Sequence, residues 1–60
     1  MTLYRRGTTV IEIIRLRFGG VAGSEAQIRN VAPLAERKPY AEWYPVALLL
    51  AAGWVEVRKP

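Results

Sequence analysis

The sequence predicts a small α+β domain of order β-α-α-β, in which a short antiparallel sheet packs on two helices. Three observations lead to this prediction. A run of β-branched residues at 8–18 alternates in the way a strand does. Two helix-start signals follow it, a capping pattern at Ser24 and a proline at position 45. The last residues alternate again and supply a second strand.

Residues 8–18 are expected to form the main strand, because β-branched side chains are dense there. The even positions form an apolar face that only Glu12 interrupts, whereas the odd positions begin apolar and end with Arg15 and Arg17. Strand geometry then places these two arginines on one face, about 7 Å apart. The preceding residues 2–6 form either a first strand or an arm.

Two helices are expected between the strands. Ser24 opens a capping-box pattern, and Pro33 would stop the helix that follows. The second helix is predicted at 46–52, with Pro45 in its first turn and Gly53 as the residue that reverses the chain. The body of this helix has no polar face, so we expect part of it to meet a partner or a second copy of the chain.

The end of the chain predicts a strand with Val55 and Val57 facing inward, paired with the strand at 10–18. Residues 48–59 resemble the join between the last helix and the wing strand of winged-helix DNA-binding domains. In that family the recognition helix carries polar and basic side chains on its outer face, which reach base edges in the major groove. The matching helix here lacks such side chains, which argues against groove recognition by this helix.

Composition excludes several function classes. The 60 residues allow one domain, covering residues 1–60, and include no Cys, no His and no Asp. Without Cys or His, an ordinary zinc or haem site cannot be built, and a Ser-His-Asp or Cys-His arrangement lacks its base. The only serine, Ser24, is explained as a helix cap. We therefore expect no catalysis, no metal and no small-molecule cofactor.

The predicted compartment is the cytoplasm. Without Cys the chain needs no oxidising environment, and its first residues lack the long apolar stretch of a signal peptide. The longest apolar run, at 46–55, is half the length of about 20 residues that a helix needs to cross a bilayer. No contact with a membrane is therefore expected.

Nine basic residues against five acidic ones give a net charge of +4, which favours polyanionic partners, nucleic acid above all. The same excess of charge also serves to keep an apolar small protein in solution. If the two strands pair, arginines gather on one sheet face, where they suit a phosphate backbone. The candidate nucleic-acid ligands are Arg15, Arg17, Arg29, Arg37, Lys38, Arg58 and Lys59.

Aromatic and leucine side chains near the apolar helix form the second set of candidates. Most aromatics in a domain this small are expected to fill the core, but Trp, Tyr and Arg also concentrate at binding hot spots. The candidate protein-interface residues are Tyr40, Trp43, Tyr44, Leu48 and Trp54.

Two functions of different class follow from these patterns. The first is a small basic accessory or regulatory factor that holds nucleic-acid phosphates without reading much sequence. The alternative is a protein–protein interaction module, such as a phage-type inhibitor, adaptor or virion accessory protein, which docks through its apolar helix or forms an oligomer.

Overall fold

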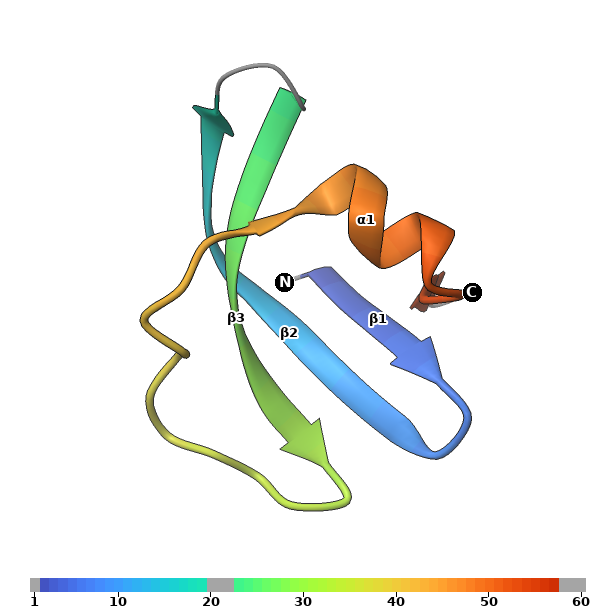
Figure 1. The fold of residues 1–60 in the computed structure, drawn as a ribbon. Helices are drawn as coiled ribbons and strands as arrows, with labels where there is room; N and C mark the ends of the chain where they lie inside the picture. The colour runs from blue at the N-terminus through green and yellow to red at the C-terminus, as the bar shows by residue number, and fades with distance from the viewer. Residues whose placement is uncertain (1, 20–22, 58–60) are drawn as a thin grey trace.

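The computed structural model describes residues 2–19 and 23–57, and these form a mostly β domain (Figure 1). A five-stranded antiparallel sheet is accompanied by one short helix, so the predicted β-α-α-β arrangement with two helices is wrong. The elements are β1 (Thr2–Arg6), β2 (Thr9–Gly19), β3 (Gly23–Ala32), β4 (Tyr44–Pro45), α1 (Val46–Ala51) and β5 (Val55–Val57).

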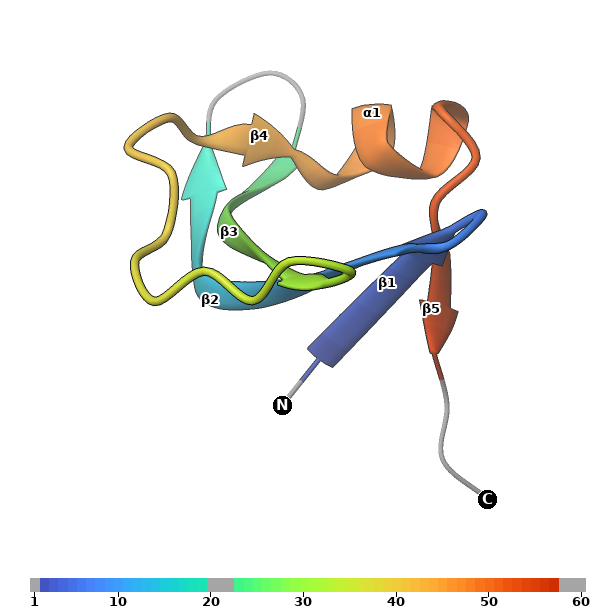
Figure 2. The same cartoon turned by 90° about the horizontal axis from the view of Figure 1, so that it is seen from below.

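The strands lie in the order β4-β3-β2-β1-β5, so the first four form a meander and the last returns to the far edge, beside β1 (Figure 2). The final strand pairs with β1 and not, as predicted, with residues 10–18. The reason is that β1 and β3 already occupy both edges of β2. Val55 and Val57 are 60% and 37% exposed, so the prediction that they face inward is also wrong.

The segment predicted as the first helix is the strand β3. Its burial follows a period of two, with Ala26 and Ile28 buried between less buried neighbours. The segment pairs with β2 from Gly23 to Ala32, and Val31 is its only residue without a partner in that ladder. A helix of fewer than ten residues before Pro33 has too few hydrogen bonds to offset the unfavourable free energy of helix nucleation by itself. Tertiary pairing therefore overrides the capping pattern at Ser24.

The second predicted helix is present as α1, and Gly53 ends it. Gly53 has a φ of 96°. Its amide donates to the carbonyl of Leu50 at 3.1 Å, and the amide of Trp54 donates to the carbonyl of Leu49 at 3.1 Å. These two bonds are the pair found in a Schellman motif. Because α1 is the only helix among the described residues, the likeness to winged-helix domains does not extend beyond this join.

One extra residue in β2, Ile14, changes the phase of the strand. Ile13 lies opposite Ile28, and the next pair is Arg15 with Gln27, so Ile14 has no partner across the ladder. Such a bulge bends a strand. Figure 2 shows β2 curving between its first half, which pairs with β1, and its second half, which pairs with the beginning of β3.

The curved sheet has an inner face, which packs against α1, and an outer face on the opposite side. Before the bulge the odd positions of β2 face inward, and after it the even positions do, because Leu16 lies opposite the buried Ala26. The buried core is small, and four further side chains pack against it. The core consists of Tyr4, Ile11, Ala26, Ile28 and Leu49, with Ile13, Tyr44, Val46 and Trp54 around it.

The loop at 33–43 covers most of the edge of β3. Strand β4 pairs only with Glu25 and Ala26, which leaves the rest of that edge without a strand. The amides of Glu36 and Tyr40 instead donate to the carbonyls of Asn30 and Ile28, both at 2.8 Å. The loop is therefore held against the sheet by the bonds that a longer strand would have made.

Candidate nucleic-acid interface

Strand alternation places four arginines on the outer face of the sheet. Arg5 follows the buried Tyr4 in β1, and Arg29 follows the buried Ile28 in β3. Arg15 and Arg17 flank the inward Leu16 in β2. They share the outer face with the acidic Glu12 and Glu25 and with Gln27. The prediction that Arg15 and Arg17 lie on one strand face therefore agrees with the register.

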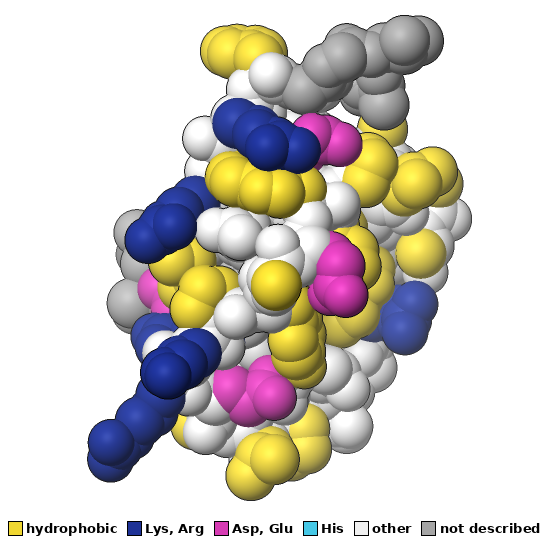
Figure 3. Space-filling view, turned by 60° about the vertical axis from the view of Figure 1, so that its left-hand side comes forward, with side chains coloured by type: hydrophobic (Ala, Val, Ile, Leu, Met, Phe, Trp, Pro, Cys, Tyr) yellow, Lys and Arg dark blue, Asp and Glu magenta, His cyan; other side chains and the backbone are white. Residues whose placement is uncertain are grey.

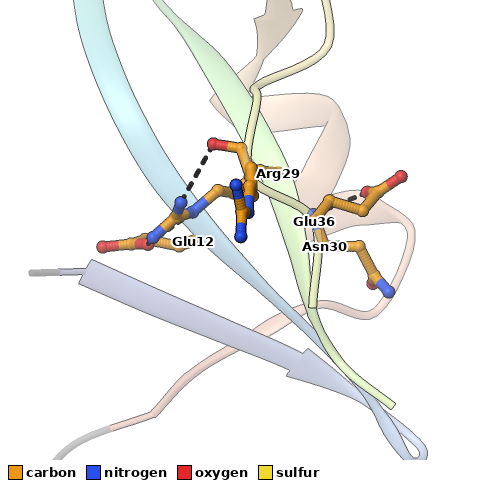
Figure 4. Close-up of polar contacts among 5 residues, drawn as sticks. Glu12, Arg29, Asn30 and Glu36 are labelled. Carbon is orange, nitrogen blue, oxygen red and sulfur yellow. Dashed lines mark hydrogen bonds and ion pairs between the residues drawn. The ribbon is translucent and has the colours of Figure 1, made fainter. Parts of the chain in front are cut away.

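Arg29 lies between Glu12 and the loop (Figure 4). Its Nε and Nη2 atoms donate to Oε1 of Glu12, directly opposite on β2, at 2.9 and 2.7 Å. Its Nη1 donates to the carbonyl of Arg37 at 3.2 Å. Glu36 accepts from the amide of Asn30 at 3.0 Å. Since Glu12 is only 9% exposed, this cluster is more a structural tie between two strands and the loop than an open phosphate site.

Arg17 is held by an acid and an aromatic ring. Its Nε donates to Oε1 of Glu25, opposite it in the ladder, at 3.0 Å. Its guanidinium carbon lies 4.2 Å from the centroid of the Trp43 ring. The Arg17 side chain remains 51% exposed, so the group is fixed in place and still faces solvent.

The remaining basic side chains on this side of the molecule are exposed. Among residues 2–19 and 23–57, the ion pairs are Arg17–Glu25 and Arg29–Glu12, so Arg5, Arg15, Arg37 and Lys38 have no carboxylate within 4.0 Å. Figure 3 shows Lys and Arg side chains on the left and upper part of the molecule and also on its right, separated by hydrophobic and acidic ones. The surface is therefore a set of separated cations and not a continuous basic groove.

Sequence reasoning missed the contribution of Arg5 and the partner of Trp43. The alternation of Leu3, Tyr4 and Arg5 could have assigned Arg5 to this face, had residues 2–6 been placed in the sheet. Trp43 was grouped with the protein-interface candidates, but it lies under Arg17 on the outer face. Arg58 and Lys59, both predicted as nucleic-acid ligands, lie outside the described residues.

The other protein-interface candidates do not share one surface. Tyr44 and Trp54 pack against the core, and Arg6 covers the Trp54 ring at 4.7 Å from its centroid. Tyr40 and Leu48 are 38% and 64% exposed. The predicted exposure of the apolar helix is thus seen at Leu48, whereas Tyr44 and Trp54 stabilise the fold by packing against the core.

Two tyrosines of the loop and β4 keep their protons more tightly than free tyrosine. The Glu36 carboxylate, as hydrogen-bond acceptor, raises the pKa of Tyr40 above 10.0. Partial burial, with the neighbouring Glu42 carboxylate, raises the pKa of Tyr44. Both phenols therefore lose their protons at a higher pH than a free tyrosine does.

Apolar side chains are exposed at the end of the β2–β3 hairpin. Leu16 is 61% exposed and Phe18 is 96% exposed. Both lie on the inner face, past the part of the sheet that α1 covers, and so on the side opposite Arg15 and Arg17. The hairpin therefore presents arginines on one side and apolar side chains on the other.

In the part of the chain that the structure describes, no three acidic side chains gather to hold a metal ion. None of its helices has the length and apolarity needed to span a membrane. No protein-family model, curated protein or solved structure matches this chain significantly. The chemistry of the outer face and of the hairpin is therefore the ground for inferring a function.

Proposed function

We propose that this protein is a small, non-enzymatic accessory factor that binds nucleic acid by holding phosphates on the outer face of its sheet. The observation that carries the proposal is the strand register, which assigns Arg5, Arg15, Arg17 and Arg29 to that one face. Positive charge so arranged attracts a phosphate backbone, and counterion release then drives binding with little dependence on sequence.

The exposed arginines contribute most of this attraction. Arg5 and Arg15 are exposed and make no ion pair among the described residues, so their guanidinium groups can meet phosphates without first leaving a carboxylate. Arg37 and Lys38 extend the positive charge along the loop. The backbone carbonyl of Arg37 accepts a hydrogen bond from Arg29, which holds this part of the loop beside the outer face. Arg29 itself supports the face by fixing the loop to β3.

The test is fluorescence-anisotropy titration of labelled DNA and RNA at several salt concentrations. We expect affinity to fall steeply as salt is added, because each neutralised phosphate releases condensed ions. Arg15→Gln and Arg5→Gln should each lower the slope of log affinity against log salt by about one, because each removes one phosphate contact. Phe18→Ser is the matched control, since it changes the opposite side of the same hairpin without changing charge.

Absence of binding at low salt would refute the proposal. If both arginine variants bind with an unchanged slope of log affinity against log salt, the phosphates contact another part of the protein and not the outer face. Loss of affinity in Phe18→Ser alone would favour an apolar contact in place of an ionic one.

A second candidate function, protein–protein contact, is favoured by one specific observation. Phe18 is 96% exposed and adjoins the exposed Leu16, which is unusual for large apolar side chains with no partner. A second copy of the chain suits this patch. The patch lies on the side away from Arg15 and Arg17, so two copies meeting there would keep these arginines apart.

A further inference from the structure

The contact between Arg17 and Trp43 has the form of a stacking platform. The guanidinium lies over the indole, with 4.2 Å between its carbon and the ring centroid. Glu25 holds Nε of the same guanidinium at 3.0 Å. Two neighbours therefore hold the Arg17 guanidinium, and 51% of the Arg17 side chain remains exposed to solvent.

A flat, fixed guanidinium is a good surface for a nucleobase. Unpaired bases stack on aromatic rings and on arginine planes, whereas bases inside a duplex already stack on each other. A guanidinium that is held before binding loses little conformational freedom when a base arrives. Arg15, two residues away on the same face, can hold a neighbouring phosphate.

We propose that the Arg17–Trp43 pair is a base-stacking site and that the nucleic acid bound by the outer face is single-stranded. This inference rests on the proposed function. Arg17 supplies the surface that meets the base, Trp43 supports it from below, and Glu25 sets its orientation. Phosphates on either side of the stacked base lie against the exposed arginines of the outer face.

The deciding variant is Arg17→Lys, which keeps the charge and removes the plane. The native protein and this variant are titrated into a labelled oligonucleotide of about 12 nucleotides, single-stranded and as a duplex of the same sequence. We expect the native protein to bind the single strand more tightly. Arg17→Lys should weaken single-strand binding about tenfold and leave duplex binding nearly unchanged.

Two further variants separate the platform from charge and folding. Arg15→Lys changes an arginine on the same strand face that has no aromatic partner, so the preference for single strands should persist. Trp43→Leu removes the support under Arg17 and should reduce the preference as Arg17→Lys does. Circular dichroism confirms that each variant is folded before it is titrated.

The outcomes also separate this inference from the proposed function. Equal or tighter binding of the duplex by the native protein would overturn the stacking site and leave phosphate binding intact. A preference for single strands that survives Arg17→Lys would also overturn it. Failure to bind either form would overturn both.

Discussion

Arg29 shows how one side chain can serve the fold on a surface that is otherwise open to ligands. It donates to Glu12 on the neighbouring strand and to the carbonyl of Arg37 in the loop. The sequence assigned Arg29 to the nucleic-acid ligands because of its charge alone. Its register opposite Glu12, which only the sheet pairing reveals, makes it a structural residue first.

Replacing Arg29 with Met should destabilise the protein more than any other arginine substitution on the outer face. Glu12, only 9% exposed, would then lose the side chain that donates to it, and leaving a buried polar group without its partner costs about 2–3 kcal/mol. The double variant Glu12→Leu/Arg29→Met should regain much of the lost stability, because neither member of the pair is left without its partner. Urea denaturation measures each free energy of unfolding.

Arg15→Met is the control for that series, since an exposed arginine without an ion pair should change stability by less than about 0.5 kcal/mol. A single variant Arg29→Met as stable as the native protein would show that the Glu12 contact contributes nothing net.

Other side-chain assignments could be made from the sequence because they follow from a local period. Arg15 and Arg17 are two residues apart in a clear strand, so a shared face was predictable. Trp43 could not be matched to Arg17, since the two meet only through the pairing of β2, β3 and β4.

At the scale of elements, residues 24–32 were predicted as a helix and form most of the strand β3. Their capping pattern fits a helix, and their alternating burial appears only when β2 lies alongside. The short strand β4 and the loop that covers β3 left no periodic signal, because two residues and an irregular loop carry none. By contrast, β2 and α1 were predicted correctly, since β-branched density and the Pro–Gly bounds are local signals.

The turn after α1 gives a prediction at this scale. Gly53→Ala should lower stability by about 1 kcal/mol, because a φ of 96° strains any residue with a Cβ. The nearest atom to that Cβ would be Cδ of Arg6 at 3.9 Å, an ordinary contact, so the cost comes from the backbone. For a chain this small, such a loss lowers the melting temperature by about 4–8 °C.

Gly53→Asn serves as the comparison, because asparagine tolerates this conformation better than alanine. It should therefore melt between the native protein and Gly53→Ala. An alanine variant with an unchanged melting temperature would contradict the left-handed turn.

At the scale of the whole molecule, charged and apolar side chains are divided between two sides at the end of the β2–β3 hairpin. A 60-residue chain hides only about 60% of its unfolded surface, so apolar side chains remain outside however it folds. Here they lie at the hairpin end and on α1, and also in the loop at Leu34 and in β5 at Val55, which is directly opposite Arg5 in the ladder. The excess of apolar residues predicted such exposure, whereas its location depended on the bend of the sheet.

This division predicts concentration-dependent self-association. Sedimentation equilibrium should show a monomer–dimer equilibrium that Phe18→Ser weakens and Arg15→Gln leaves unchanged, because only the former removes apolar contact area. A native protein that stays monomeric at millimolar concentration would contradict dimerisation through the apolar patch at the hairpin end.

Ile14 gives this division a genetic consequence. The side chains of a strand alternate, so loss of one residue from a regular paired stretch reverses every position beyond it, whereas loss of the unpaired residue of a bulge does not. In-frame deletion of this single codon would place Arg15 directly after the inward Ile13, so Arg15 and Arg17 would stay on the outer face and only the bulge and its bend would be lost. In-frame deletion of Leu16, in the regular stretch beyond the bulge, would instead turn Arg17 inward and Phe18 outward. The separation of charged and apolar surfaces at the hairpin is thus encoded by residue count as well as residue type, and the bulge is the one place in β2 where a lost residue leaves it intact.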